Sequence, residues 1–86
     1  MDIGVEISLY PLKADYAPAV HEFLERLAGH TGLKIVTNSL STQVFGSFEE
    51  VMQALRAALG ASVTSMAAAC ERGVFVMKVI GPLPPA

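Results

Sequence analysis

Residues 3–10, with the sequence IGVEISLY, indicate the fold class. The apolar side chains of this stretch recur at every second position: Ile3, Val5, Ile7 and Leu9. Because successive side chains of an extended chain point to opposite faces, this pattern predicts a β-strand with one face on the core. Pro11 is expected to end the strand, since a proline has no N–H to donate to a ladder.

Two helices are predicted further along the chain. The first covers about residues 16–30, with Asp15 as a candidate N-cap and Pro18 in the first turn, where a missing N–H costs little. The second begins at Ser47, which has capping-box spacing to Glu50. Its apolar side chains follow one helical stripe as far as about residue 70.

Three more stretches are typical of β-strands. Residues 33–37 and 40–45 are separated by a polar Asn-Ser pair, and a two-residue link of this kind favours a hairpin. Residues 74–80 are apolar on both faces except for Lys78. We therefore expect this last strand to be covered on both sides or to be central in its sheet.

The predicted order is strand, helix, strand, strand, helix, strand. With right-handed crossovers, this order gives an α+β fold, the ferredoxin-like βαββαβ sandwich, in which a four-stranded antiparallel sheet carries two helices on one face. The single domain is expected to span residues 1–80, followed by a proline-rich C-terminal tail at residues 81–86. The uncovered face of the sheet is then available for dimerisation or for a ligand.

The composition limits the class of protein. The chain has 86 residues, which is the length of one small domain. Of these residues, 52% are apolar and 16% are charged, which is more apolar than a monomeric domain of this size needs to be. This excess is a hint of an oligomer. Six scattered Lys and Arg residues and a net charge of −2 disfavour nucleic-acid binding. The N-terminus lacks a basic signal-peptide region, and the most apolar stretch, 57–70, is too short to span a bilayer. We expect a cytoplasmic protein without membrane contact.

Residues that could support catalysis or metal binding are scattered. His21-Glu22 begins like a zinc-binding HExxH motif, but Glu25 occupies the position of the second histidine. Cys70 is the single cysteine, and no neighbour in the sequence would lower its pKa. Without a nucleophile–base pair or a ligand cluster, we expect no catalytic residue, no metal site and no cofactor. The chain is predicted to bind rather than to catalyse.

Two stretches together resemble a known family. Residues 7–12 (ISLYPL) and residues 37–46 (TNSLSTQVFG) resemble the YkoF-like proteins, which bind thiamine and its hydroxymethylpyrimidine precursor. The SLYP motif, the Ser-Thr pair and the following glycine match in order, and the resemblance extends over about residues 5–80. It implies a single-domain member whose sheet pairs with another copy, as a homodimer or a higher homo-oligomer.

The resemblance also implies a binding site for a small heteroaromatic ligand. An aminopyrimidine needs fixed hydroxyl or amide groups for its edge and an apolar or aromatic wall for its face. The polar candidates are Ser8, Asn38, Ser41, Thr42 and Gln43; the wall candidates are Tyr10, Phe45 and Met77; and Glu6 is the strand carboxylate that could face a cation.

Each polar candidate also has a structural explanation. Ser8, Ser41, Gln43 and Glu6 are placed as ordinary exposed strand residues, Thr42 falls on the helix-facing side, and Asn38 is a common turn residue. The hairpin of this chain is also less acidic than that of YkoF, and Lys78 adds a positive charge. Both differences favour a neutral pyrimidine over cationic thiamine.

A second hypothesis is an oligomerising regulatory or interaction module with the topology of ACT domains. Its sheet would serve pairing, and a different small molecule would bind between the subunits. ACT domains usually accompany other domains, and this chain has one domain, so we rank this hypothesis second.

Overall fold

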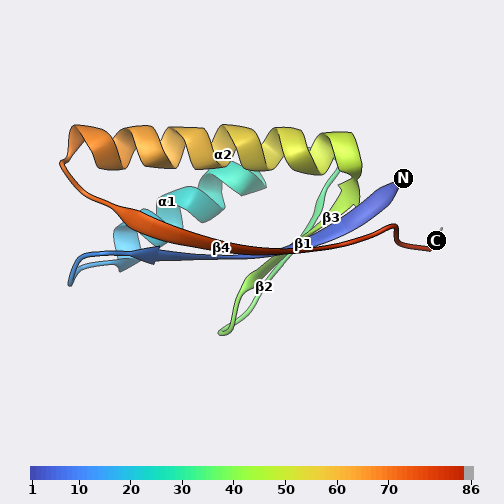
Figure 1. Ribbon diagram of the computed structural model, residues 1–86, viewed down its shortest axis with the longest axis horizontal. Helices are drawn as coiled ribbons and strands as arrows, with labels where there is room; N and C mark the ends of the chain where they lie inside the picture. The colour runs from blue at the N-terminus through green and yellow to red at the C-terminus, as the bar shows by residue number, and fades with distance from the viewer. Residues whose placement is uncertain (85–86) are drawn as a thin grey trace.

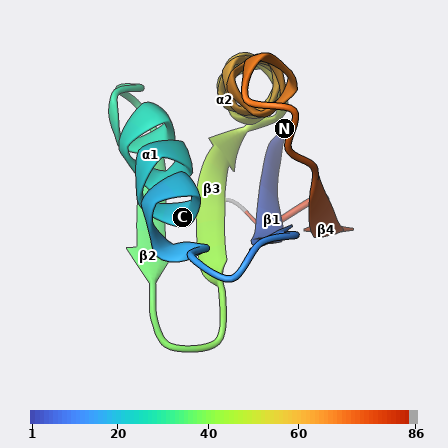
Figure 2. The ribbon, with the colours of Figure 1, turned by 90° about the vertical axis from the view of Figure 1, so that its left-hand side faces the viewer.

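The computed structural model describes residues 1–84. Its elements are β1 (Asp2–Pro11), α1 (Ala17–Ala28), β2 (Lys34–Thr37), β3 (Thr42–Ser47), α2 (Phe48–Ala68) and β4 (Gly73–Ile80). The strands form one antiparallel sheet in the order β2-β3-β1-β4, and both helices lie on the same side of it (Figures 1 and 2). The predicted α+β ferredoxin-like arrangement is confirmed.

The core lies between the sheet and the two helices. The alternating apolar residues of β1 are all buried, as the period of two predicts, and Val44 of β3 extends the same surface. Phe23 and Leu27 of α1 and Val51 and Leu55 of α2 pack onto them. Because α2 packs on β3 and β1, it runs along the middle of the sheet (Figure 2).

The helix ends agree in part with the sequence analysis. Ser47 caps α2, and its Oγ accepts a hydrogen bond from the Glu50 N–H at 3.2 Å. Pro18 lies in the first turn of α1 as expected. The prediction that Asp15 caps α1 is wrong, because the N-cap is Tyr16, without a side-chain hydrogen bond. After α2, the chain reverses through Cys70, which adopts a left-handed conformation with φ of 55°.

The strands differ from their predicted ends at two places. Pro11 is still part of β1 and lies opposite Gly73 of β4, so the proline does not end the strand. The hairpin link has four residues, 38–41, rather than two, because β3 begins only at Thr42. The Asn38 N–H donates to the Ser41 carbonyl at 3.1 Å, and this bond closes the turn.

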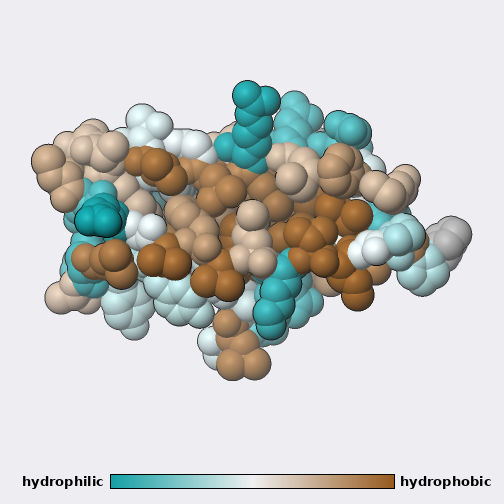
Figure 3. All heavy atoms as spheres, in the orientation of Figure 1, coloured by the Kyte–Doolittle hydropathy of each residue, from teal (hydrophilic) through white to brown (hydrophobic). Residues whose placement is uncertain are grey.

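β4 occupies an edge of the sheet, which corrects the expectation of a central or doubly covered strand. Its apolar residues are exposed on both faces, since α2 lies over β3 and β1 and leaves β4 uncovered. In the view of Figure 3, apolar residues form a band along this edge below α2. The exposed residues of β4 are Val74, Val76, Met77, Val79 and Ile80.

The described part of the predicted tail remains beside the sheet. The Leu83 N–H donates to the Asp2 carbonyl at 2.8 Å, which holds residues 81–84 near the start of β1. Residues 85–86 lie outside the described residues. Within residues 1–84, neither helix combines the length and the apolar character that a membrane crossing requires.

Candidate functional site

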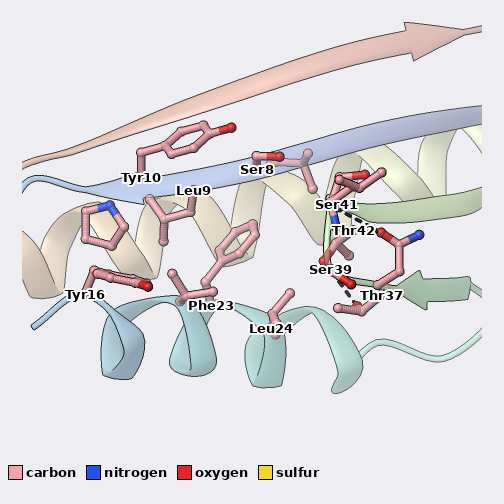
Figure 4. A pocket seen from close by; sticks show the side chains of 15 residues that line it. Ser8, Leu9, Tyr10, Tyr16, Phe23, Leu24, Thr37, Ser39, Ser41 and Thr42 are labelled. Atoms are coloured by element: carbon pink, nitrogen blue, oxygen red, sulfur yellow. Dashed lines mark hydrogen bonds between the residues drawn. The ribbon is translucent and has the colours of Figure 1, made fainter.

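A cavity of about 570 Å³ opens where β1 extends beyond its neighbour. The ladder between β1 and β3 ends at the pair Ile7–Thr42, while β1 continues to Pro11 along β4. The β2–β3 hairpin and α1 close the remaining sides of this gap (Figure 4). Because the cavity opens at a strand edge, residues from both faces of β1 line it. Backbone groups of residues 8–11 on the side of β3 are free of ladder partners and available to a ligand.

The base of the cavity is apolar. Phe23 and Leu24 project from α1 toward β1, and the Phe23 ring is also fixed by an edge-to-face contact with Phe75, at 5.3 Å between ring centroids. Ile7, Leu9 and Val20 complete this surface. A flat ring ligand could bury its apolar face here at a small desolvation cost. The side chains offer an apolar surface, and the core holds them in place.

Two tyrosines stand at one end of the cavity. Tyr10 comes from β1 and Tyr16 from the N-cap of α1, with Pro11 between them in the chain (Figure 4). Their side chains are 55% and 60% exposed, so neither is needed to fill the core. Exposed aromatic rings at a cavity mouth are suited to stacking on a planar ligand.

Hydroxyl and amide groups gather at the opposite end. Thr37 and Thr42 pair through their Oγ1 atoms at 3.1 Å at the base of the hairpin. The Oδ1 of Asn38 accepts hydrogen bonds from the N–H groups of Leu40 and Ser41, at 2.8 and 3.2 Å. Asn38 therefore acts as the turn residue that the sequence allowed, and its Nδ2 group remains as a donor. Ser8 and Ser39 contribute further hydroxyls.

Ser41 connects the cavity to the uncovered face of the sheet. Its Oγ donates to Oε2 of Glu6 at 3.0 Å, and the other carboxylate oxygen of Glu6 lies 3.9 Å from Nζ of Lys78. The hydroxyl proton of Ser41 is thus engaged, which leaves its lone pairs to accept a hydrogen bond from a ligand N–H. Glu6 is a positioning residue in this arrangement.

The structure brings five of the seven predicted site residues to one cavity: Ser8, Tyr10, Asn38, Ser41 and Thr42. Glu6 and Gln43 instead line a separate shallow depression of about 330 Å³ on the uncovered sheet face. Phe45 lies in that depression, with its ring over Gly4, where an added Cβ would come within 2.9 Å of the ring. Met77 lines neither cavity, so Phe45 and Met77 do not form the expected wall.

Several lining residues were missed in the sequence. Val20, Phe23 and Leu24 follow the helical spacing that is typical of core residues, and Tyr16 lies directly after the predicted cap. Thr37 and Ser39 belong to the hairpin, and their part in the cavity depends on the length of its loop. An exposed aromatic residue directly before a helix is the signal that could have identified Tyr16.

A second, smaller crevice of about 150 Å³ lies between α1 and α2. There Nζ of Lys13 lies 2.7 Å from Oε2 of Glu71. The hydrogen bond with Glu71 raises the pKa of Lys13 above its ordinary value of 10.5. Arg26 donates to the buried Oγ of Ser62 at 2.9 Å. Both basic groups are engaged within the fold. Across residues 1–84, no three His, Cys, Asp or Glu side chains come together as metal ligands would.

The topology and the cavity define a ferredoxin-like α+β protein with a candidate ligand site at the β1–β3 gap. The model of the YKOF-related family matches residues 2–76, and the chain belongs to this family. No curated protein matches the sequence significantly.

Solved structures share the fold at low sequence identity. A Streptococcus pneumoniae protein has a TM-score of 0.83 at 18% identity. The alignment covers 96% of this chain and 89% of the Streptococcus pneumoniae chain. A Bacillus cereus domain of unknown function, DUF77, has a TM-score of 0.75 at 14% identity, with 95% and 77% covered. A candidate thiamine biosynthesis or salvage protein from Thermotoga maritima has a TM-score of 0.68 at 21% identity, with 95% and 85% covered.

Proposed function

We propose that the chain is a non-enzymatic binding protein for thiamine, hydroxymethylpyrimidine or a related heteroaromatic metabolite. The observation that supports this most is the division of the cavity into an aromatic end and a hydroxyl-rich end. Tyr10 and Tyr16 offer ring faces, while Ser8, Ser39 and the hairpin offer donors and acceptors for the edge of an aminopyrimidine. Family membership and the likeness to the Thermotoga maritima protein support the same ligand class.

Thermal unfolding with and without ligand tests this proposal. A ligand at about 100 times its dissociation constant stabilises the folded state by about 2.7 kcal/mol. For a domain of this size, each kcal/mol raises the midpoint by about 4–8 °C. We expect a rise of about ten degrees or more with hydroxymethylpyrimidine or thiamine, and a matching heat signal in calorimetric titration. No shift with either compound at millimolar concentration would overturn the proposal.

We further propose that the chain acts as a homo-oligomer through the free edge of β4. This strand presents unpaired backbone groups along eight residues, with apolar side chains on both faces. A second copy of the same edge can pair with it antiparallel about a two-fold axis, which covers both kinds of group at once. Val79, at 60% exposure, would be covered by such pairing.

Sedimentation equilibrium tests the oligomer. The native chain is expected to sediment as a dimer or larger species at micromolar concentration, and Val79→Lys as a monomer, since a charge on the strand would oppose pairing. Thr64→Lys adds the same charge on the exposed surface of α2 and should not change the mass. A native chain that is monomeric at this concentration would contradict the proposal.

The exposed β4 edge also supports the second candidate, an interaction module of ACT-like topology with a different ligand. The two candidates differ in the thermal experiment. A dimer that neither thiamine nor hydroxymethylpyrimidine stabilises would favour the interaction module, whereas a dimer that either compound stabilises would favour the metabolite-binding protein.

A further inference from the structure

The candidate cavity lacks charge. Within the described residues 1–84, none of its 15 lining residues is Asp, Glu, Lys, Arg or His. The nearest carboxylate in the hydrogen-bond network is Glu6, which lines the separate depression on the uncovered sheet face and is held by Ser41 and Lys78. The basic groups of Lys13 and Arg26 line the separate crevice between α1 and α2.

We infer, building on the proposed function, that this cavity takes the free alcohol form of its heteroaromatic ligand and rejects the phosphate ester of that alcohol. A phosphate brought into the cavity would lose water and meet no cation in exchange. The volume of about 570 Å³ is large enough to enclose a one-ring ester together with its phosphate. A phosphate that follows the ring into this space would lie beside neutral walls.

The N-terminus of α1 adds positive potential at this cavity, because Tyr16 is both its N-cap and a lining residue. Its effect on a phosphate is limited for two reasons. Pro18 removes an N–H group from the first turn, and the dipole of a helix acts as a partial charge rather than as a full counter-ion. The neutral hydroxyl and amide groups of the hairpin dominate the opposite end.

Calorimetric titration with hydroxymethylpyrimidine and with its monophosphate ester tests the inference. We expect the ester to bind at least about tenfold more weakly than the alcohol, since its charge is left without a partner. An ester that binds within tenfold of the alcohol would overturn the inference and leave the proposed function standing. If neither the alcohol nor the ester binds, the inference fails, and the thermal experiment with thiamine then decides whether the proposed function stands.

A lysine introduced at the cavity tests whether the phosphate ester is excluded by its charge or by its shape. Ser39 is an exposed lining residue of the hairpin, so Ser39→Lys places a cation at the hydroxyl-rich end of the cavity. This variant is expected to bring the affinity ratio of alcohol to ester below about tenfold, because a charge-assisted hydrogen bond then compensates the phosphate. Thr64→Lys, with the same charge on α2 away from the cavity, should keep the native ratio. An unchanged ratio in Ser39→Lys would overturn the electrostatic basis of the inference.

Discussion

The Oγ of Ser41 lies 3.0 Å from Oε2 of Glu6, a contact that joins residues 35 positions apart in the sequence. Ser41 lines the candidate cavity, whereas Glu6 lies in the depression on the uncovered sheet face. The carboxylate accepts the hydroxyl proton of Ser41 and so fixes the direction of this O–H group. The Ser41 oxygen therefore presents its lone pairs to the cavity, as a hydrogen-bond acceptor. Under the proposed function, Glu6 would act on the ligand through Ser41 without touching it.

Removal of the Ser41 hydroxyl is expected to weaken ligand binding. Ser41→Ala deletes one acceptor for a ligand N–H and should lower the affinity by about tenfold in calorimetric titration. Glu6→Gln keeps an oxygen that can accept the Ser41 proton, so its affinity should stay close to native. Gln43→Ala is the matched control, since Gln43 lies outside the cavity. A loss with Gln43→Ala as large as that with Ser41→Ala would move the site to the uncovered sheet face.

Tyr10 is expected to contribute to binding and little to folding. Its side chain is 55% exposed, so Tyr10→Ala should change the free energy of unfolding by less than about 1 kcal/mol, while the loss of ring stacking lowers ligand affinity by about 2–10-fold. Tyr10→Phe retains the ring and should bind like the native chain. Urea denaturation and calorimetric titration measure the two effects. Equal affinities for the native and alanine forms would exclude stacking on Tyr10.

Leu27 is expected to dominate the stability of the α1 contact with the sheet. It is completely buried, and Leu27→Ala should lower the free energy of unfolding by about 2–5 kcal/mol, because the lost contacts leave a cavity. Leu40→Ala, at a position that is 88% exposed, provides the control and should change stability by less than about 0.5 kcal/mol. Urea denaturation compares the two, and similar losses would contradict the assignment of the core.

The Lys13–Glu71 ion pair predicts a pH dependence. The hydrogen bond with Glu71 raises the pKa of Lys13 in the folded state above 10.5, so the folded state holds this proton more tightly than the unfolded state does. The resulting stabilisation is complete below pH 10.5 and is lost as the pH rises through the raised pKa. Lys13→Met should therefore be less stable than the native chain at pH 7, with a difference that shrinks above pH 11 in urea denaturation. A difference that does not change with pH would exclude the ion pair as its cause.

The sequence predicted the fold because its local signals are physically direct. The alternation in residues 3–10 follows from the geometry of an extended chain, and the spacing of Ser47 and Glu50 identifies the start of α2. The position of β4 could not be obtained in this way. An apolar pattern reports that side chains avoid water, but it does not report whether the chain itself or a partner covers them.

The candidate site could be predicted only in part. The hairpin and the SLYP stretch directed attention to Ser8, Tyr10 and Ser41, which all line the cavity. The cavity itself depends on the point where β3 stops pairing with β1, which is set by the four-residue loop that Asn38 closes. The sequence pattern indicates a link of two residues. It therefore could not predict the strand register, or that Gln43 lies outside the cavity.

The β2–β3 hairpin has a consequence for the strength of the site. β2 is only four residues long and pairs with β3 alone, so little apolar burial holds residues 34–41 in place. Segments of this kind open at low free energy and exchange their amide hydrogens quickly. The wall that carries most of the polar groups is therefore expected to open at a lower free energy than the core between β1, α1 and α2. Under the proposed function, part of the binding free energy would be spent on ordering this hairpin, and a more rigid hairpin would raise the affinity without a new contact.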